Sequence, residues 1–120
     1  MSFAASVRYA GDVAIIDLAG RIVLNDGSAV MREAIAKLRE TGANKILLNL
    51  ADVAFIDSSG LGELASAYAR TNQAGGQLKL MNLPARIVDL LRITKLDSVL
   101  IAFPGEPEAL KSFNTGAVSA

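Results

Sequence analysis

The sequence predicts an α/β fold: one domain over residues 1–120, built on a mixed, mostly parallel sheet of four to five strands, with an N-terminal hairpin and about four helices. Segments rich in β-branched and aliphatic residues alternate with segments whose apolar residues recur at helical spacing. Glycine or proline separates most of these segments, and no linker or low-complexity stretch divides the chain. Alternating strands and helices imply a mainly parallel sheet with right-handed crossovers.

The chain begins with a predicted hairpin. Its first strand includes residues 7–9, its turn lies at residues 10–12, and its second strand, residues 13–18, ends at Gly20. A helix follows Gly27 and ends at Gly42. The apolar residues of this helix share one stripe: Val30, Met31, Ala34, Ile35 and Leu38.

The rest of the chain repeats strand and helix. Residues 45–50 are almost continuously apolar, as expected of a strand covered on both faces. The pattern then predicts a helix at 58–73, a strand at 78–81, a helix beginning at Pro84, a strand at 99–103 and a helix beginning at Pro107. Residues 114–120 have little apolar surface to bury, so we expect a frayed tail.

The composition excludes several kinds of active site. The chain has no Cys, which removes disulfides, thiolate nucleophiles and Cys-based metal sites, and no His, which removes the commonest general base near neutral pH. Its 12 Lys and Arg balance 12 Asp and Glu, whereas nucleic-acid-binding surfaces carry an excess of basic residues. We therefore expect a protein-binding module without catalytic activity, metal or cofactor, and without direct contact to nucleic acid.

No segment of the sequence has the pattern of a targeting signal or a membrane anchor. The first residues lack a basic region followed by a long apolar run, and no stretch approaches the roughly 20 apolar residues of a membrane-spanning helix. We therefore expect a cytoplasmic protein without membrane insertion.

The most informative segment is residues 49–62, which read NLADVAFIDSSGLG. It lies between a predicted buried strand and a helix, so it lies at the carboxyl edge of the sheet, where sites gather in open α/β folds. Asp57, Ser58 and Ser59 are all residues that cap a helix N-terminus. Gly60 and Gly62 are poor helix formers, which indicates that the backbone passes close to something, either its own sheet or a partner.

Several interpretations of this segment are open from these residues alone. It is consistent with an ordinary capped strand-to-helix turn. A nucleophilic serine is poorly supported, because the segment is not Gly-x-Ser-x-Gly and the chain has no His to activate a hydroxyl. A phosphate-binding loop is also poorly supported, because the third glycine of a dinucleotide fingerprint and the Gly-Lys of a P-loop are missing.

The segment and its surroundings resemble STAS domains, specifically the stand-alone bacterial anti-sigma factor antagonists. The resemblance covers most of the chain. It includes the hairpin ending at Gly20, the apolar strand at 46–50, the string FIDSSGLG at 55–62, the GGQL string at 75–78 and the apolar helix at 87–91. The DSSGLG string after a buried Asn-Leu strand and ahead of Gly-Gly is a specific signature.

The resemblance implies a partner switch controlled by phosphorylation. Members of the family bind an anti-sigma factor that is also a serine kinase, and so release the sigma factor. The kinase phosphorylates the first serine of the motif, here Ser58, and a PP2C-type phosphatase restores the active form. Asp57 is then the acidic neighbour that shapes the site, and Ser59 is an adjacent hydroxyl. The expected partner-binding residues are Asp57, Ser58, Ser59, Gly60, Leu61, Gly62, Glu63 and Arg21.

One departure concerns Arg21, because several familiar antagonists carry an acidic residue after the corresponding glycine. Either Arg21 lines the interface and selects a different anti-sigma partner, or it is a solvated loop residue. Two other functions also stay open. The first is a STAS subunit of a lipid-transport ABC complex or of a stress-sensing assembly. The second, less favoured, is a small nucleotide-binding enzyme.

Overall fold

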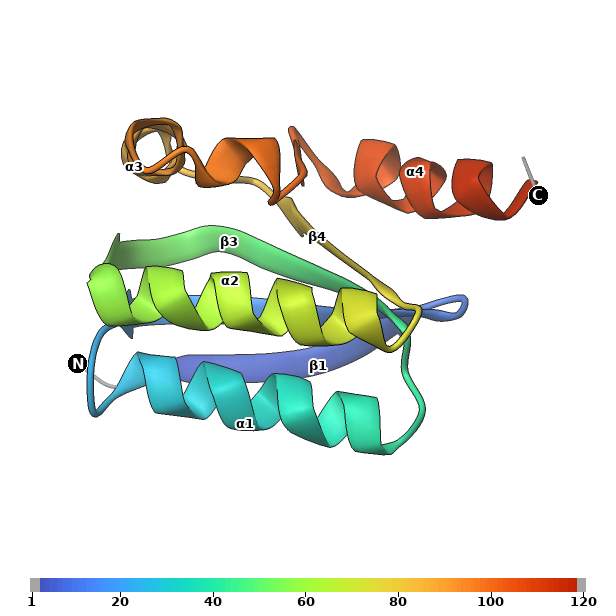
Figure 1. The fold of residues 1–120 in the computed structure, drawn as a ribbon, viewed down its shortest axis with the longest axis horizontal. Helices are drawn as coiled ribbons and strands as arrows, with labels where there is room; N and C mark the ends of the chain where they lie inside the picture. The colour runs from blue at the N-terminus through green and yellow to red at the C-terminus, as the bar shows by residue number, and fades with distance from the viewer. Residues whose placement is uncertain (1–2, 119–120) are drawn as a thin grey trace.

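The computed structural model describes residues 3–118, with side chains for residues 3–113. Within them, one sheet has the strand order β1-β2-β3-β4-β5 (Figure 1). The first two strands form an antiparallel hairpin, and the other neighbours pair in parallel. This confirms the predicted sheet. The strands are β1 (Ala4–Ala10), β2 (Val13–Ile22), β3 (Lys45–Ile56), β4 (Gln77–Met81) and β5 (Ala102–Phe103).

Helices cover both faces of the sheet. Helices α1 (Gly27–Glu40) and α2 (Ser58–Gln73) lie side by side on one face, and α3 (Ala85–Ile93) contributes to the same core (Figure 1). The last helix, α4 (Glu106–Val118), packs on the opposite face. A short 3₁₀ turn, η1 (Leu96–Ser98), follows α3. This arrangement confirms the predicted α/β class with four α-helices.

The alternation of side chains along β2 produces two separate cores. Ala14, Ile16 and Leu18 point into the main core under α1, α2 and α3, whereas Val13 and Ile15 point toward α4. All five are at most 2% exposed. Because a fully buried aliphatic side chain contributes roughly 1.5–3 kcal/mol, these central strands form a stable base for the loops at their carboxyl ends.

A network of polar residues lies on the sheet next to the core under α4. Asp17 accepts hydrogen bonds from Arg8 at 2.7 Å and from Asn49 at 2.8 Å. Asn49 in turn accepts one from Asn82 at 3.0 Å. Arg8 also reaches Glu106 at 2.7 Å, so this chain of contacts links the hairpin to the start of α4.

Strands β2 and β3 are longer than predicted. We expected β3 to end at Leu50, but it continues to Ile56, paired with the final residues of β2 through register shifts. The extension is favourable because its side chains Val53 and Ile56 are buried in the main core. It carries the backbone directly to the first residue of the DSSGLG motif.

Strand β5 is shorter than predicted. Only two residues pair with β4, whereas we expected a strand at 99–103. Lys95 has a left-handed backbone, and the amides of Val99 and Leu100 donate to the carbonyl of Leu96. These local hydrogen bonds satisfy the backbone in a turn instead of a ladder. The backbone of α4 extends to Val118, while the side chains of 114–118 and all of 119–120 lie outside the described residues, so the expected frayed tail stays a prediction.

Candidate functional site

Asp57 closes β3 and caps α2. Its backbone is extended, and its amide donates to the carbonyl of Ile22 at the end of β2, at 3.2 Å. Its Oδ1 atom accepts a hydrogen bond from the Gly60 amide at 2.9 Å and one from the Ser59 hydroxyl at 2.8 Å. This is the N-cap arrangement that the sequence suggested, in which a carboxylate satisfies amides that the first helical turn leaves unpaired.

The second carboxylate oxygen of Asp57 holds a different part of the chain. Oδ2 accepts a hydrogen bond at 3.1 Å from the amide of Leu24, in the loop between β2 and α1. The pKa of Asp57 lies below its usual range, first because of the Gly60 amide, then because of the Ser59 hydroxyl and the Leu24 amide. The ionised Asp57 carboxylate therefore holds both the loop after β2 and the start of α2.

The two serines of the motif are in different states. Ser59 donates its hydroxyl to Asp57 and is half-buried. Ser58 is the first residue of α2 and is exposed, and its hydroxyl has no hydrogen-bond partner among the described residues. Of the two motif serines, both within the described residues, only Ser58 therefore has a free and exposed hydroxyl.

The two glycines have different surroundings. A Cβ atom on Gly60 would lie 2.5 Å from the Ile22 carbonyl oxygen and 2.6 Å from Ile56 Cγ1, so this glycine lets α2 pack against the sheet. A Cβ atom on Gly62 would meet nothing within 4 Å, and Gly62 is exposed. The close approach inferred from the sequence is therefore to the protein's own sheet at Gly60. At Gly62 the helix surface is open.

Two other predicted partner-binding residues are occupied within the protein. Leu61 is buried in the main core, although it also lines a pocket beside Ser58. Glu63 is half-buried and pairs with Arg32 of α1 at 2.7 Å, so its carboxylate joins the two helices.

Arg21 is not a loop residue. It lies in β2 opposite Phe55 of β3, and its guanidinium carbon lies 5.1 Å from the centroid of the Phe55 ring. The longer β2 explains the difference from the sequence expectation, because it includes the residue after Gly20. Arg21 is exposed, and the stacked ring holds its guanidinium near the site.

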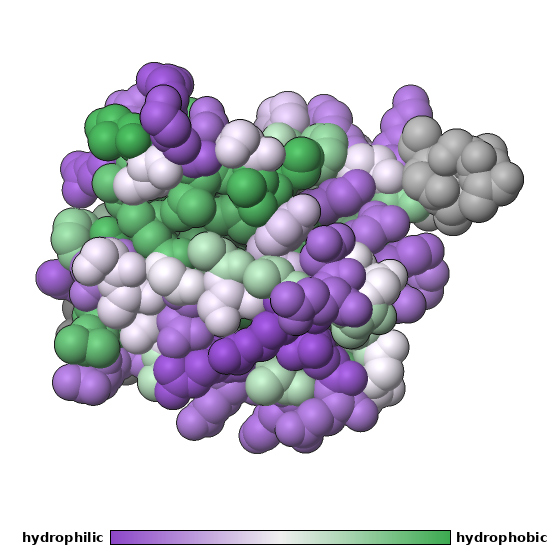
Figure 2. Space-filling model, viewed as in Figure 1, coloured by the Kyte–Doolittle hydropathy of each residue, from purple (hydrophilic) through white to green (hydrophobic). Residues whose placement is uncertain are grey.

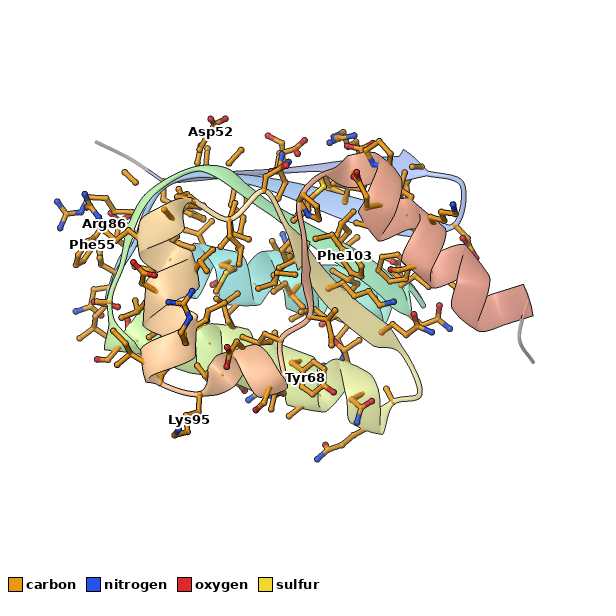
Figure 3. The ribbon with its side chains drawn as sticks, turned by 90° about the horizontal axis from the view of Figure 1, so that it is seen from above. Asp52, Phe55, Tyr68, Arg86, Lys95 and Phe103 are labelled. Carbon is orange, nitrogen blue, oxygen red and sulfur yellow. The ribbon has the colours of Figure 1, made fainter. Side chains whose placement is uncertain are left out.

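A pocket of about 440 Å³ lies between the end of β3, the start of α2 and the face of α3. In Figure 2, hydrophobic residues gather at the upper left, between the helices labelled α3 and α2 in Figure 1. Arg86, at the start of α3, lies next to Phe55 (Figure 3). The pocket is lined by Phe55, Ile56, Asp57, Ser58, Leu61, Arg86, Ile87, Leu90 and Thr94.

Part of this surface lies outside the expected partner-binding residues. From the sequence, Arg86 of α3 is either a solvated helix residue or a contact to an acidic partner, and Leu24 and Phe55 are not among the expected partner-binding residues. Leu24 is 66% exposed and Phe55 is 39% exposed, so two large apolar side chains face solvent near the capped start of α2. The run Arg21-Ile22-Val23-Leu24 is a weak indication of this exposed surface, because an apolar residue such as Leu24, just after the end of a strand, is not placed in the core by the alternation of the strand.

A comparison with protein families decides the family. The model of the STAS domain matches residues 4–109 of this chain. The chain belongs to the STAS domain family. Among the described residues of this STAS domain, no helix is long and apolar enough to cross a membrane, and no group of three His, Cys, Asp or Glu residues could hold a metal ion.

Individual proteins resemble this STAS domain over most of its length. The anti-sigma-B factor antagonist of Bacillus subtilis is 35% identical over 85 residues, which is 71% of this chain and 76% of that protein. The crystal structure of a putative anti-sigma factor antagonist from Thermotoga maritima superposes with a TM-score of 0.84 at 23% identity, covering 90% of this chain and 92% of that one. SpoIIAA of Bacillus in its phosphorylated form gives a TM-score of 0.71 at 20% identity, covering 92% of this chain and 99% of that one. The two structures show the shared fold.

Proposed function

We propose that this STAS domain is an anti-sigma factor antagonist of the cytoplasm. It binds an anti-sigma factor that is also a serine kinase, and so releases a sigma factor. Phosphorylation of Ser58 by that kinase ends the binding, and a PP2C-type phosphatase restores it. The domain itself catalyses no reaction in this scheme, and needs no cofactor.

The observation that carries the proposal is the free, exposed hydroxyl of Ser58 on a fixed helix start. Asp57 holds that start through hydrogen bonds to Gly60, Ser59 and Leu24. A kinase needs a hydroxyl that it can reach, and a partner needs a surface of defined shape, and both are present here. The names of the Bacillus subtilis relative and of the phosphorylated SpoIIAA support the same role.

Phosphorylation at this position affects binding more than folding. A phosphoserine carries about −1.5 to −2 charges at neutral pH. At a helix N-terminus this charge meets the positive end of the helix dipole, so the folded domain tolerates it. In an interface that was formed around a neutral hydroxyl, burying the same charge against the partner commonly costs several kcal/mol, which is more than a hundredfold in affinity at about 1.4 kcal/mol for each factor of ten.

The proposed partner surface is centred on Ser58. Asp57, Ser59 and Gly60 shape it from below through the cap, whereas Gly62 offers an open helix surface on the next turn. Arg21 lies at its margin. Leu61 and Glu63 contribute through the packing of α2 on the core and on α1.

The test is phosphorylation by the anti-sigma factor kinases encoded in the same genome. Each kinase is incubated with the purified domain and ATP, and the phosphate is located by mass spectrometry of peptides. We expect one phosphate on Ser58 and none on Ser58→Ala. Ser59→Ala is the matched control, and it should still accept phosphate at Ser58. Phosphate on another residue, or none with any of these kinases, would refute the proposal.

A further inference from the structure

The pocket beside Ser58 is an unfilled apolar space in a partly exposed surface. Ile56 and Ile87 line it, and both are buried residues of the main core. Leu90 of α3 and Thr94, the residue that follows α3, also line it. A pocket of about 440 Å³ accommodates one or two large side chains, so an apolar group of a partner can bury itself here without displacing the core.

The surroundings of the pocket are also apolar. Phe55 lies at its edge with 39% of its surface exposed. Leu24, whose amide is held by Asp57 on the other side of the motif, is 66% exposed. An exposed aromatic side chain at the edge of an apolar pocket is typical of the central part of a protein–protein interface, and Leu24 adds apolar surface on the other side of Asp57.

The charged groups at the pocket are mostly basic. Arg86 lines it and Arg21 stacks on Phe55, and within the described residues neither arginine has an ion-pair partner. The one acidic lining residue, Asp57, already accepts three hydrogen bonds from the motif and from Leu24. Arg86 and Phe55 line the same pocket (Figure 3), and Arg21 lies over the Phe55 ring, so both guanidinium groups have donors close to the pocket.

We propose that this pocket receives an apolar side chain of the anti-sigma partner, and that Arg21 and Arg86 bind a carboxylate next to that side chain. The inference rests on the proposed function and names the chemistry of its partner. A guanidinium binds a carboxylate in a bidentate manner, and one stacked on an aromatic ring retains its N–H donors for that purpose. The apolar pocket supplies contact area, and the arginines supply selection among partners.

The same geometry gives the phosphate on Ser58 a specific effect. Ser58 and Arg86 line one pocket, so the phosphate enters the space that the partner's side chain occupies. It also neutralises the arginine charge that the partner's carboxylate uses. Phosphorylation therefore acts twice on the same contact, once by occupying space and once by competing for Arg86.

The first experiment measures affinity for the anti-sigma factor that phosphorylates the domain. We expect Arg86→Glu and Arg21→Glu each to weaken binding about tenfold or more, because a repulsion replaces an attraction. Arg70→Glu is the matched control, since Arg70 is exposed in the last turn of α2, far along the helix from Ser58. It should leave affinity nearly unchanged. Equal affinity for all three variants would overturn the inference and leave the phosphorylation of Ser58 standing.

The second experiment needs no anti-sigma factor. Two capped tetrapeptides, Asp-Leu-Leu-Asp and Lys-Leu-Leu-Lys, are titrated into the isotope-labelled domain, and amide shifts are followed by NMR. We expect the acidic peptide to shift amides around the pocket, the basic peptide to bind more weakly, and Arg86→Glu to reverse this preference. The result would overturn the inference if neither peptide shifted those amides, or if the basic one bound better.

A fatty acid has the same chemistry as this peptide, since it joins an apolar chain to a carboxylate. Octanoate is therefore titrated in parallel. Weak or absent binding of octanoate is the expected result. If octanoate bound more tightly than the acidic peptide and displaced it, the pocket would be a small-molecule site, and the proposed protein contact would be rejected.

Discussion

The Asp57 carboxylate and the Leu24 amide, 33 positions apart in the sequence, are joined by a hydrogen bond of 3.1 Å. The same carboxylate caps α2 through Gly60 at 2.9 Å. The loop after β2 and the start of α2 are therefore held by one side chain. We therefore expect a change at Asp57 to alter the positions of Leu24 and of the start of α2 together.

Removing the Asp57 carboxylate should loosen both segments. We predict that Asp57→Ala lowers the melting temperature and speeds hydrogen exchange at the amides of Leu24 and Gly60, because both lose their acceptor. Asp57→Asn retains one acceptor oxygen and should have a smaller effect. Asp52→Ala, on an exposed residue of β3, serves as the control. Unchanged protection of Leu24 in Asp57→Ala would show that the loop is held by other contacts.

The stability conferred by Asp57 should depend on pH. Its pKa is lowered in the folded state, chiefly by the Gly60 amide. The ionised carboxylate is therefore more stable in the folded protein than in the unfolded chain, and ionisation stabilises the fold. The contribution is fully present above the unfolded pKa of about 4 and is lost as the pH falls through the lower folded pKa. Denaturant unfolding should therefore show wild type more stable than Asp57→Asn near neutral pH, with the difference shrinking in acid. A difference that grew in acid would contradict the assignment.

The two glycines of the motif should respond to alanine in opposite ways. Gly60→Ala would place a Cβ atom 2.5 Å from the Ile22 carbonyl oxygen, and we predict a loss of about 1–3 kcal/mol in the free energy of unfolding. Gly62→Ala meets open space, and removing a helix-breaking residue should raise stability by up to about 1 kcal/mol. Chemical denaturation measures both changes.

If Gly62 is open because a partner approaches there, the more stable variant should also bind that partner more weakly. Affinity for the anti-sigma factor kinase is the measurement. Undiminished binding of Gly62→Ala would remove Gly62 from the proposed interface without affecting the case for Ser58.

The fold was predictable because its elements have distinct periodicities. The alternation along β2 and the stripe of α1 each report a buried face, and the α/β order follows from them. The end of β3 was not predictable, because Val53 and Ile56 become buried only through pairing with the last residues of β2. The start of β5 was predicted too early, for the opposite reason. Val99 and Leu100 suit a strand, yet their amides donate to the carbonyl of Leu96 in a local turn.

The parts of the site formed by neighbouring residues in the sequence were predictable, whereas the parts formed by residues far apart in the sequence were not. The cap at Asp57 involves residues three positions apart, so the motif contains it. The pocket brings β3, α2 and α3 together, and no spacing along the chain records that Arg86 lies near Phe55. The ion pair between Arg32 and Glu63 was missed for the same reason, because it joins two helices.

A negative charge at Ser58 should separate binding from folding. We predict that Ser58→Glu weakens binding to the anti-sigma factor about tenfold or more, while the free energy of unfolding changes by no more than about 0.5 kcal/mol, because Ser58 is exposed and begins α2. Calorimetry of binding and of thermal unfolding measures the two effects on the same sample. Ser58→Gln has a similar size without the charge, so it should bind more tightly than Ser58→Glu. Equal weakening by both would mean that bulk ends the interaction, and a large drop in melting temperature would place Ser58 in the fold instead of the interface.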